Sequence, residues 1–186
     1  ALSIKAHVDM GFAGDLSPFA AAYLVGMAAS VYDIPNVKAS LQLYKTNKSS
    51  RTTVRSPGGP EAVYAMEQII MRISETLKLC SVGVREKNLY SLSRVQALAK
   101  GLHDKGQYKH YTPPRLIKEL RESAGYDHLV KRVETFNSSN RWKKQGVDLA
   151  CASFKVDPCA KGVLFNVYGD GSIVVHCATS EMGQGE

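Results

Sequence analysis

Two hydrophobic periods occur in this chain, and their mixture is what most limits the folds it can adopt. Residues 2–10 change between apolar and polar at every position; the apolar ones are Leu2, Ile4, Ala6, Val8 and Met10. A period of two predicts a strand with one face buried. Residues 37–44 repeat the alternation and predict a second strand.

Helical spacing separates and follows these two strands. Ser17 and Pro18 fit a helix start, and we expect that helix to run through Val31 and to end before Ile34-Pro35-Asn36. A longer helix after Gly59 carries one apolar stripe, made of Val63, Met66, Ile69, Ile70, Ile73 and Leu77. Shorter helices are predicted at residues 82–89, 114–122 and 126–136, and the weakly patterned residues 90–111 predict a loop.

The last third of the chain is rich in predicted strands. Residues 147–154 form one candidate strand, and residues 162–168 and 172–177 flank Gly169-Asp170-Gly171, a strong hairpin signal. Strands and helices mix without a strict alternation of the two. The expected class is therefore α+β, a mixed and mostly antiparallel sheet with helices packed on one face as a two-layer sandwich.

The net charge of +7 suggests a nucleic-acid partner, but the distribution of the charge argues against one. Lys and Arg are spread along the chain, with small clusters only at residues 115–121 and 141–144. Aromatic residues, 8% of the chain, are not interleaved with them as stacking platforms would be. No apolar run approaches 18 residues, so no membrane span is predicted.

Four cysteines are present, and no two of them are separated by two residues. Zinc-ribbon and iron–sulfur spacings are therefore absent, and no metal ligand is assigned. The first residues lack the basic and apolar regions of a secretion signal, so we expect reduced thiols in the cytoplasm, with the peroxisome as the alternative.

The loop of residues 53–61 opens directly into the longer helix. Unpaired amides at a helix start attract anions, and Arg55 adds a permanent positive charge one step before the glycines. The simpler interpretation is a plain helix start, with a glycine N-cap, Pro60 at the first helical position and Glu61 in the first turn, and the loop alone favours it. A second glycine loop, Gly183-Gln184-Gly185, follows the last predicted strand.

Five motifs in the same order resemble the molybdopterin-binding domain of the xanthine dehydrogenase and aldehyde oxidase family. They are residues 32–37 with 44–47, residues 51–61, residues 84–90, residues 140–146, and residues 168–172 leading to 181–185. The resemblance covers nearly all of residues 1–186 and is weakest at 91–136. It implies a partial domain with a strand–helix part at 1–90, a variable helical part at 91–136 and a strand-rich part at 137–186.

The resemblance implies a fragment of a much larger enzyme. Such enzymes hold a molybdenum–molybdopterin cofactor, with iron–sulfur clusters and FAD in other domains, and oxidise purines, aldehydes or N-heterocycles with water as the oxygen source. The implied partners are the rest of the parent polypeptide, a small-molecule substrate and a second copy of the full-length enzyme. The family's general base would lie beyond Glu186, so we expect the isolated chain to be inactive.

Residue by residue, the resemblance makes Arg55 the arginine beside the molybdenum centre, a catalytic and cofactor-binding candidate together with Gly58. Gln184, with Gly183 and Gly185, resembles the loop that hydrogen-bonds the pterin. Tyr23 and Pro57 are the substrate-binding candidates.

These two candidates leave the substrate open. Tyr23 stands where xanthine-oxidising members have an arginine, and Pro57 stands where they have a purine-stacking phenylalanine. Tyr23 has an equal alternative as a helix residue packed on the sheet. Two alternative functions stay open, a non-enzymatic interaction module that keeps the fold and, less favoured, a basic nucleic-acid-binding domain.

Overall fold

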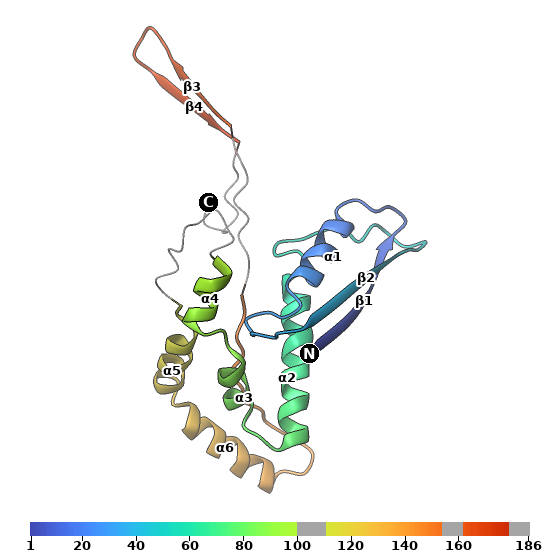
Figure 1. Cartoon of the computed structure of the whole chain (residues 1–186), viewed down its shortest axis with the longest axis vertical. Coiled ribbons are helices and arrows are strands. Elements are labelled where there is room, and N and C mark those ends of the chain that lie inside the picture. Colours follow the sequence, from blue (N-terminus) through green and yellow to red (C-terminus); the bar gives the residue numbers. More distant parts are fainter. Residues whose placement is uncertain (100–110, 154–161, 179–186) are drawn as a thin grey trace. The chain divides into compact units, whose positions relative to one another are not determined.

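The computed structural model describes residues 1–99, 111–153 and 162–178 (Figure 1). These residues form six helices and two two-stranded sheets, which confirms the α+β class. The chain divides into two compact units, residues 1–153 and residues 154–186, and each is described by itself. The predicted division at residues 90 and 136 stays a prediction.

The first unit begins with a strand–helix–strand arrangement. Strand β1 (Leu2–Gly11), helix α1 (Ser17–Gly26) and strand β2 (Val37–Lys45) follow one another, and the two strands are parallel. Leu2 pairs with Val37 and Val8 with Leu43, so the alternating apolar positions of both strands are in register. This pair is parallel, because α1 supplies the crossover that parallel neighbours require. Helix α1 also ends earlier than predicted, at Gly26 rather than after Val31.

Helix α2 (Gly59–Leu77) is the longest element and supplies much of the first core. Met66 and Ile70 are buried, whereas Ile73 and Leu77 of the predicted stripe are exposed. Along this helix the core cluster therefore ends at Ile70. Its buried members come from β1, α2, α3 and the segment after α1, and they are Leu2, Val31, Tyr32, Met66, Ile70 and Val84.

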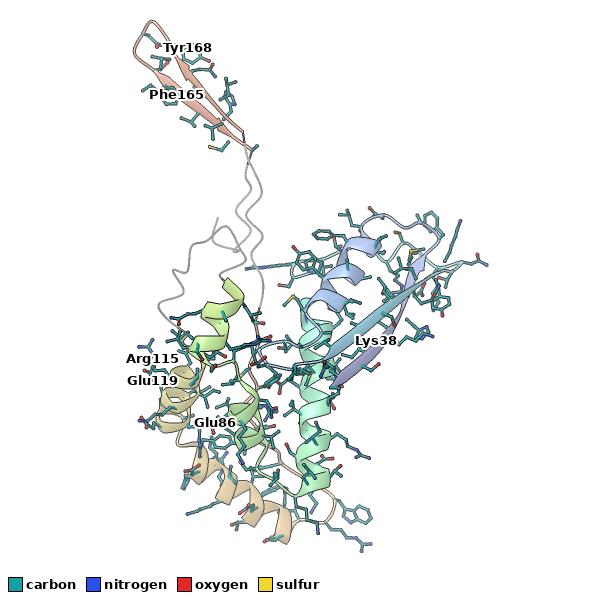
Figure 2. The ribbon with its side chains drawn as sticks, in the orientation of Figure 1. Lys38, Glu86, Arg115, Glu119, Phe165 and Tyr168 are labelled. Atoms are coloured by element: carbon teal, nitrogen blue, oxygen red, sulfur yellow. The ribbon has the colours of Figure 1, made fainter. Side chains whose placement is uncertain are left out.

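A second core cluster joins three shorter helices, α3 (Ser81–Asn88), α5 (Pro113–Ser123) and α6 (Tyr126–Ser139). Its buried residues are Val82, Ile117, Tyr126 and Leu149. All three helices were predicted, although α6 continues through residues 137–139, where a turn was expected. On the exposed face of α5, Arg115 and Glu119 form an i,i+4 ion pair of 3.7 Å (Figure 2).

Helix α4 comprises Leu92–Ala99. The sequence prediction of a loop at residues 90–111 is therefore wrong over this helix. The Ser91 hydroxyl accepts a hydrogen bond of 3.2 Å from the backbone N–H of Arg94, a side-chain cap at the helix start. Leu92, Val95 and Leu98 follow at helical spacing. The cap and this apolar spacing produce a helix despite the polar composition of the segment. Residues 100–110 lie outside the described part.

The predicted strand at residues 147–154 is also wrong over residues 147–153, which the structure describes without regular secondary structure. Leu149 is buried in the second core cluster, and Val147 and Cys151 pack beside it. The alternation of these residues correctly indicates one buried face. Alternation alone does not make a strand, because a strand also needs a neighbouring strand to pair with. Phe154, the last residue of the predicted strand, lies outside the described residues.

The described part of the second unit is a hairpin of β3 (Val163–Val167) and β4 (Ile173–Cys177), as predicted. Gly171 has a φ of +85°, and the backbone N–H of Ser172 donates to the Asp170 carboxylate at 2.9 Å, which closes the turn. The side chains of Phe165 and Tyr168 project from the hairpin (Figure 2). By register, one face consists entirely of apolar side chains and cysteine: Val163, Phe165, Val167, Ile173, Val175 and Cys177.

Candidate functional site

The polar segment before α2 is tied to the connection between β1 and α1. The backbone N–H of Arg51 donates to the carbonyl of Met10 at 3.0 Å, and the N–H of Phe12 donates to the carbonyl of Lys48 at 2.9 Å. The buried Ser17 hydroxyl donates to the carbonyl of Arg51. The loop that carries the candidate residues is therefore anchored at the start of α1.

Gly58 is the N-cap of α2 and packs directly on α1. Its φ is +72°, and a Cβ built on it would lie 2.1 Å from the carbonyl oxygen of Ala20 and 2.6 Å from the backbone nitrogen of Leu24. Only glycine fits both the conformation and the space. The plain helix-start interpretation therefore explains Gly58, although the helix begins at Gly59, one residue earlier than expected. A cofactor contact of Gly58 stays a prediction.

Arg55 lies three residues before this contact and is exposed. Within the described ranges, its guanidinium has no hydrogen bond and no ion pair. Ser56, which follows it, adopts a φ of +61°, an uncommon conformation for a residue with a side chain. The loop therefore holds a cation that is available to an anionic ligand.

The two substrate candidates lie on the two sides of the same contact. Tyr23 is on α1, half-buried, with its ring 4.8 Å from the ring of Phe19. Pro57 is half-buried in the turn before Gly58. Because Gly58 contacts Ala20 and Leu24, the loop and the turn of α1 that carries Tyr23 are neighbours (Figure 1). The candidates Gly183, Gln184 and Gly185 lie outside the described residues.

The structure adds an ion network around a buried arginine that sequence analysis did not identify. Arg85 of α3 is 1% exposed, and its Nε donates to Glu67 of α2 at 2.7 Å. Its Nη1 and Nη2 donate to the two carboxylate oxygens of Asp148 at 3.0 Å and 2.9 Å. The Tyr32 hydroxyl donates to the other oxygen of Glu67, and the Ser81 hydroxyl donates to Asp148 at 2.7 Å.

The electrostatics favour the charged forms of Arg85 and Asp148 and the neutral form of Tyr32. Burial alone would lower the pKa of Arg85, but the hydrogen bonds to Asp148 and Glu67 outweigh it and raise that pKa. Burial also opposes ionisation of Asp148, yet Ser81 and Arg85 hold its pKa below the ordinary value. Burial and the bond to Glu67 raise the pKa of Tyr32, which stays a protonated donor.

Two signals in the sequence point to this network. Glu67 stands beside Met66 on the buried face of α2, and Asp148 stands between Val147 and Leu149, both of which pack inward. Glu67 is buried, and a charged residue is rarely buried without a partner, whereas Asp148 is partly exposed. Arg85 and Tyr32 belong to two of the motifs on which the family resemblance rests, and Glu67 joins them.

The described helices include none that is long and apolar enough to cross a bilayer. In the described part of the chain, no three His, Cys, Asp or Glu side chains gather as a metal-ligand set.

Matches of two regions of the chain to protein-family models, together with the fold, define the class of protein. Residues 1–89 and residues 119–186 each match a model described as a molybdopterin cofactor-binding domain. The structure is similar to the aldehyde oxidoreductase of Desulfovibrio desulfuricans, with a TM-score of 0.70 and 20% identity over 94% of this chain and 19% of that one. The Cu,Mo-CO dehydrogenase also has a TM-score of 0.70, at 18% identity over 98% of this chain and 25% of that one.

Sequence comparison with curated proteins gives the family. The xanthine dehydrogenase of Dictyostelium discoideum is 33% identical over 190 residues, all of this chain and 14% of that protein. The indole-3-acetaldehyde oxidase of Arabidopsis thaliana is 32% identical over 185 residues, all of this chain and 13% of that protein. The chain belongs to the xanthine dehydrogenase and aldehyde oxidase family, in its molybdopterin cofactor-binding domain. It spans 13–14% of the length of these two relatives.

Proposed function

We propose that this chain is the part of a molybdenum-dependent hydroxylase that presents Arg55 to the cofactor. The parent enzyme oxidises purines, aldehydes or N-heterocycles with water as the oxygen source. The observation that carries the proposal is the exposed guanidinium of Arg55, which pairs with none of the described residues, on a loop seated on α1 through Gly58. An anchored cation orients an anionic group better than a mobile one.

The residues present fit the cofactor's chemistry. When bound, the molybdenum–molybdopterin group supplies the redox centre of the reaction. Arg55 supplies a forked cationic donor beside it, and Gly183, Gln184 and Gly185 supply backbone and side-chain amides for the pterin. Tyr23 and Pro57 border the substrate. Iron–sulfur clusters and FAD belong to other domains of the parent, a cytoplasmic homodimer.

Substitution of Arg55 in the parent enzyme tests this role. Arg55→Met removes the charge and should lower turnover by about 10²-fold, the usual loss when one preorganised donor to a reacting centre is removed. Arg72→Met is the matched control, because the Arg72 side chain is 83% exposed on α2 and only pairs with Glu75. Equal turnover and equal molybdopterin content in both variants would exclude a functional role for Arg55.

Tyr23→Arg tests the substrate assignment. If Tyr23 borders the substrate, the arginine supplies the hydrogen-bond donors that a purine needs and shifts kcat/KM from aldehydes toward purines. An unchanged ratio in a folded variant means that Tyr23 is only a helix residue that packs on its neighbours.

We also infer that the 186-residue chain alone is inactive, because the predicted base lies beyond it. Turnover of an aldehyde or a purine by the purified chain after incubation with molybdopterin and molybdate would refute this inference. Sequence determination of the parent gene separates the enzyme from a non-enzymatic module, since an intact downstream glutamate motif and upstream cysteine clusters favour the enzyme.

A further inference from the structure

The buried guanidinium of Arg85 joins three parts of the first unit. Glu67 belongs to α2, Arg85 to α3, and Asp148 to the irregular segment of residues 147–153. Glu67 and Arg85 lie in the first region that matches the cofactor-binding domain models, and Asp148 lies in the second. One side chain therefore connects the two matched regions.

Stability alone does not account for such a network. A buried ion pair is often no more stabilising than apolar residues of the same volume, because the charges must be removed from water. What the guanidinium provides is geometry, since its donors leave in fixed, coplanar directions. Three of them are used here, one toward Glu67 and two toward Asp148. The fork therefore fixes the direction of α2 relative to the segment of residues 147–153.

The position of α2 in turn sets the position of the loop of residues 53–58, called the Arg55 loop below, which leads directly into this helix. Glu67 lies eight residues after Gly59 in the same helix, about 12 Å along its axis. At its start, α2 is seated on α1 through Gly58, where a Cβ would meet the Ala20 carbonyl at 2.1 Å. The helix is thus held at two points, and loss of the Glu67 contact frees it to tilt about the other.

We propose that Arg85 is a positioning residue for the cofactor site: it holds α2, and with it the Arg55 loop, in place against the segment of residues 147–153. The inference rests on the proposed function, because the loop matters to the cofactor only if Arg55 does. The inference has a structural half, that Arg85 holds α2 in place, and a functional half, that this position matters for cofactor binding. The structural half does not depend on any cofactor and can be measured on this chain alone.

Hydrogen exchange of the chain tests the structural half. Arg85→Lys keeps the charge and loses the fork, so the amides of Gly59, Ala62 and Leu149 should exchange about tenfold faster, through local opening. All three amides are hydrogen-bonded, to Ser56, Gly58 and Asp148 respectively. Ile117→Val is the control, a core change that weakens the fold through the second cluster, which includes Leu149 but none of the charged residues of the network.

The pattern of exchange separates positioning from stability. Faster exchange at these three amides, with β1 unchanged, supports the proposal. Exchange in Arg85→Lys that matches Ile117→Val at every amide overturns it. Should Arg85→Lys fail to fold, Asp148→Asn replaces it, because its side chain is 28% exposed and the Arg85–Glu67 bond survives; the same two outcomes then decide.

Molybdopterin content of the parent enzyme tests the functional half. The pterin is released, oxidised and counted by fluorescence, so the readout needs no turnover. Arg85→Lys should retain several-fold less pterin than Ile117→Val. Wild-type pterin content in Arg85→Lys overturns the positioning role, whereas wild-type content and turnover in Arg55→Met overturn the proposed function instead.

Discussion

Gly58→Ala is the substitution whose cost the structure defines most directly. The new Cβ would lie 2.1 Å from the carbonyl oxygen of Ala20 and 2.6 Å from the backbone nitrogen of Leu24, and neither backbone atom can rotate away. An alanine at a φ of +72° costs about 1–2 kcal/mol. Overpacking adds about 1–3 kcal/mol, and the stiffer unfolded chain returns less than about 1 kcal/mol.

The expected loss is therefore about 1–5 kcal/mol, a large part of the roughly 5–15 kcal/mol by which domains are stable. With a urea dependence of about 2 kcal/mol per molar, the unfolding midpoint should fall by about 0.5–2.5 M. Circular dichroism against urea measures this shift in the 186-residue chain.

Two other glycines divide the cost into its parts. Gly125 has a φ of +58° but open space around it, so Gly125→Ala carries the conformational cost alone. Gly14 has open space and no positive φ, so Gly14→Ala should be nearly neutral. If Gly58→Ala loses no more than Gly125→Ala, the close packing of the Arg55 loop on α1 is refuted.

Further predictions concern the network, the thiols and α4. Although burial opposes it, Ser81 and Arg85 hold the pKa of Asp148 below its ordinary value of 3.8. The contribution of Asp148 to folding is therefore complete above about pH 4 and is lost as the pH falls through the lower folded pKa. Asp148→Asn should lower the urea midpoint at pH 7 and flatten its decline below pH 4. With a disulfide-exchange reagent, the exposed Cys80 and Cys177 should react well before Cys151, whose pKa burial raises; equal rates would contradict this order. Ser91→Ala should cost α4 about 1 kcal/mol, seen as faster amide exchange there, and unchanged exchange would show that the cap is not important.

The sequence predicts most elements of the fold but not their pairing. Alternation locates β1, β2 and the hairpin, because it reports a chain with one buried face. It cannot say whether β1 and β2 are parallel, which the crossover through α1 decides. The same limit explains residues 147–153, where alternation is real but no strand lies alongside in the described part. The polar, weakly patterned composition of residues 90–111 predicts a loop, whereas the start of α4 depends on a single serine cap.

The sequence predicts those parts of the candidate site whose residues are close together in the chain. It does not predict contacts between residues that are far apart in the chain. Arg55 and Gly58 stand in one loop, so their chemistry can be seen in a few residues of sequence. The partners of Arg85 lie 18 and 63 residues away from it in the chain, and no spacing rule connects them. The family resemblance marked Arg85 and Tyr32 as parts of motifs without assigning either a contact.

The apolar face of the β3–β4 hairpin has a practical consequence for handling the protein. Val163, Phe165 and Val167 are each more than half exposed, and an isolated two-stranded hairpin is barely stable in water. Such a face, next to strand edges that pair with no other described strand, is a template for self-association. When the chain is expressed alone, concentrated samples should precipitate. Phe165→Lys places a charge on this face and should keep such samples in solution.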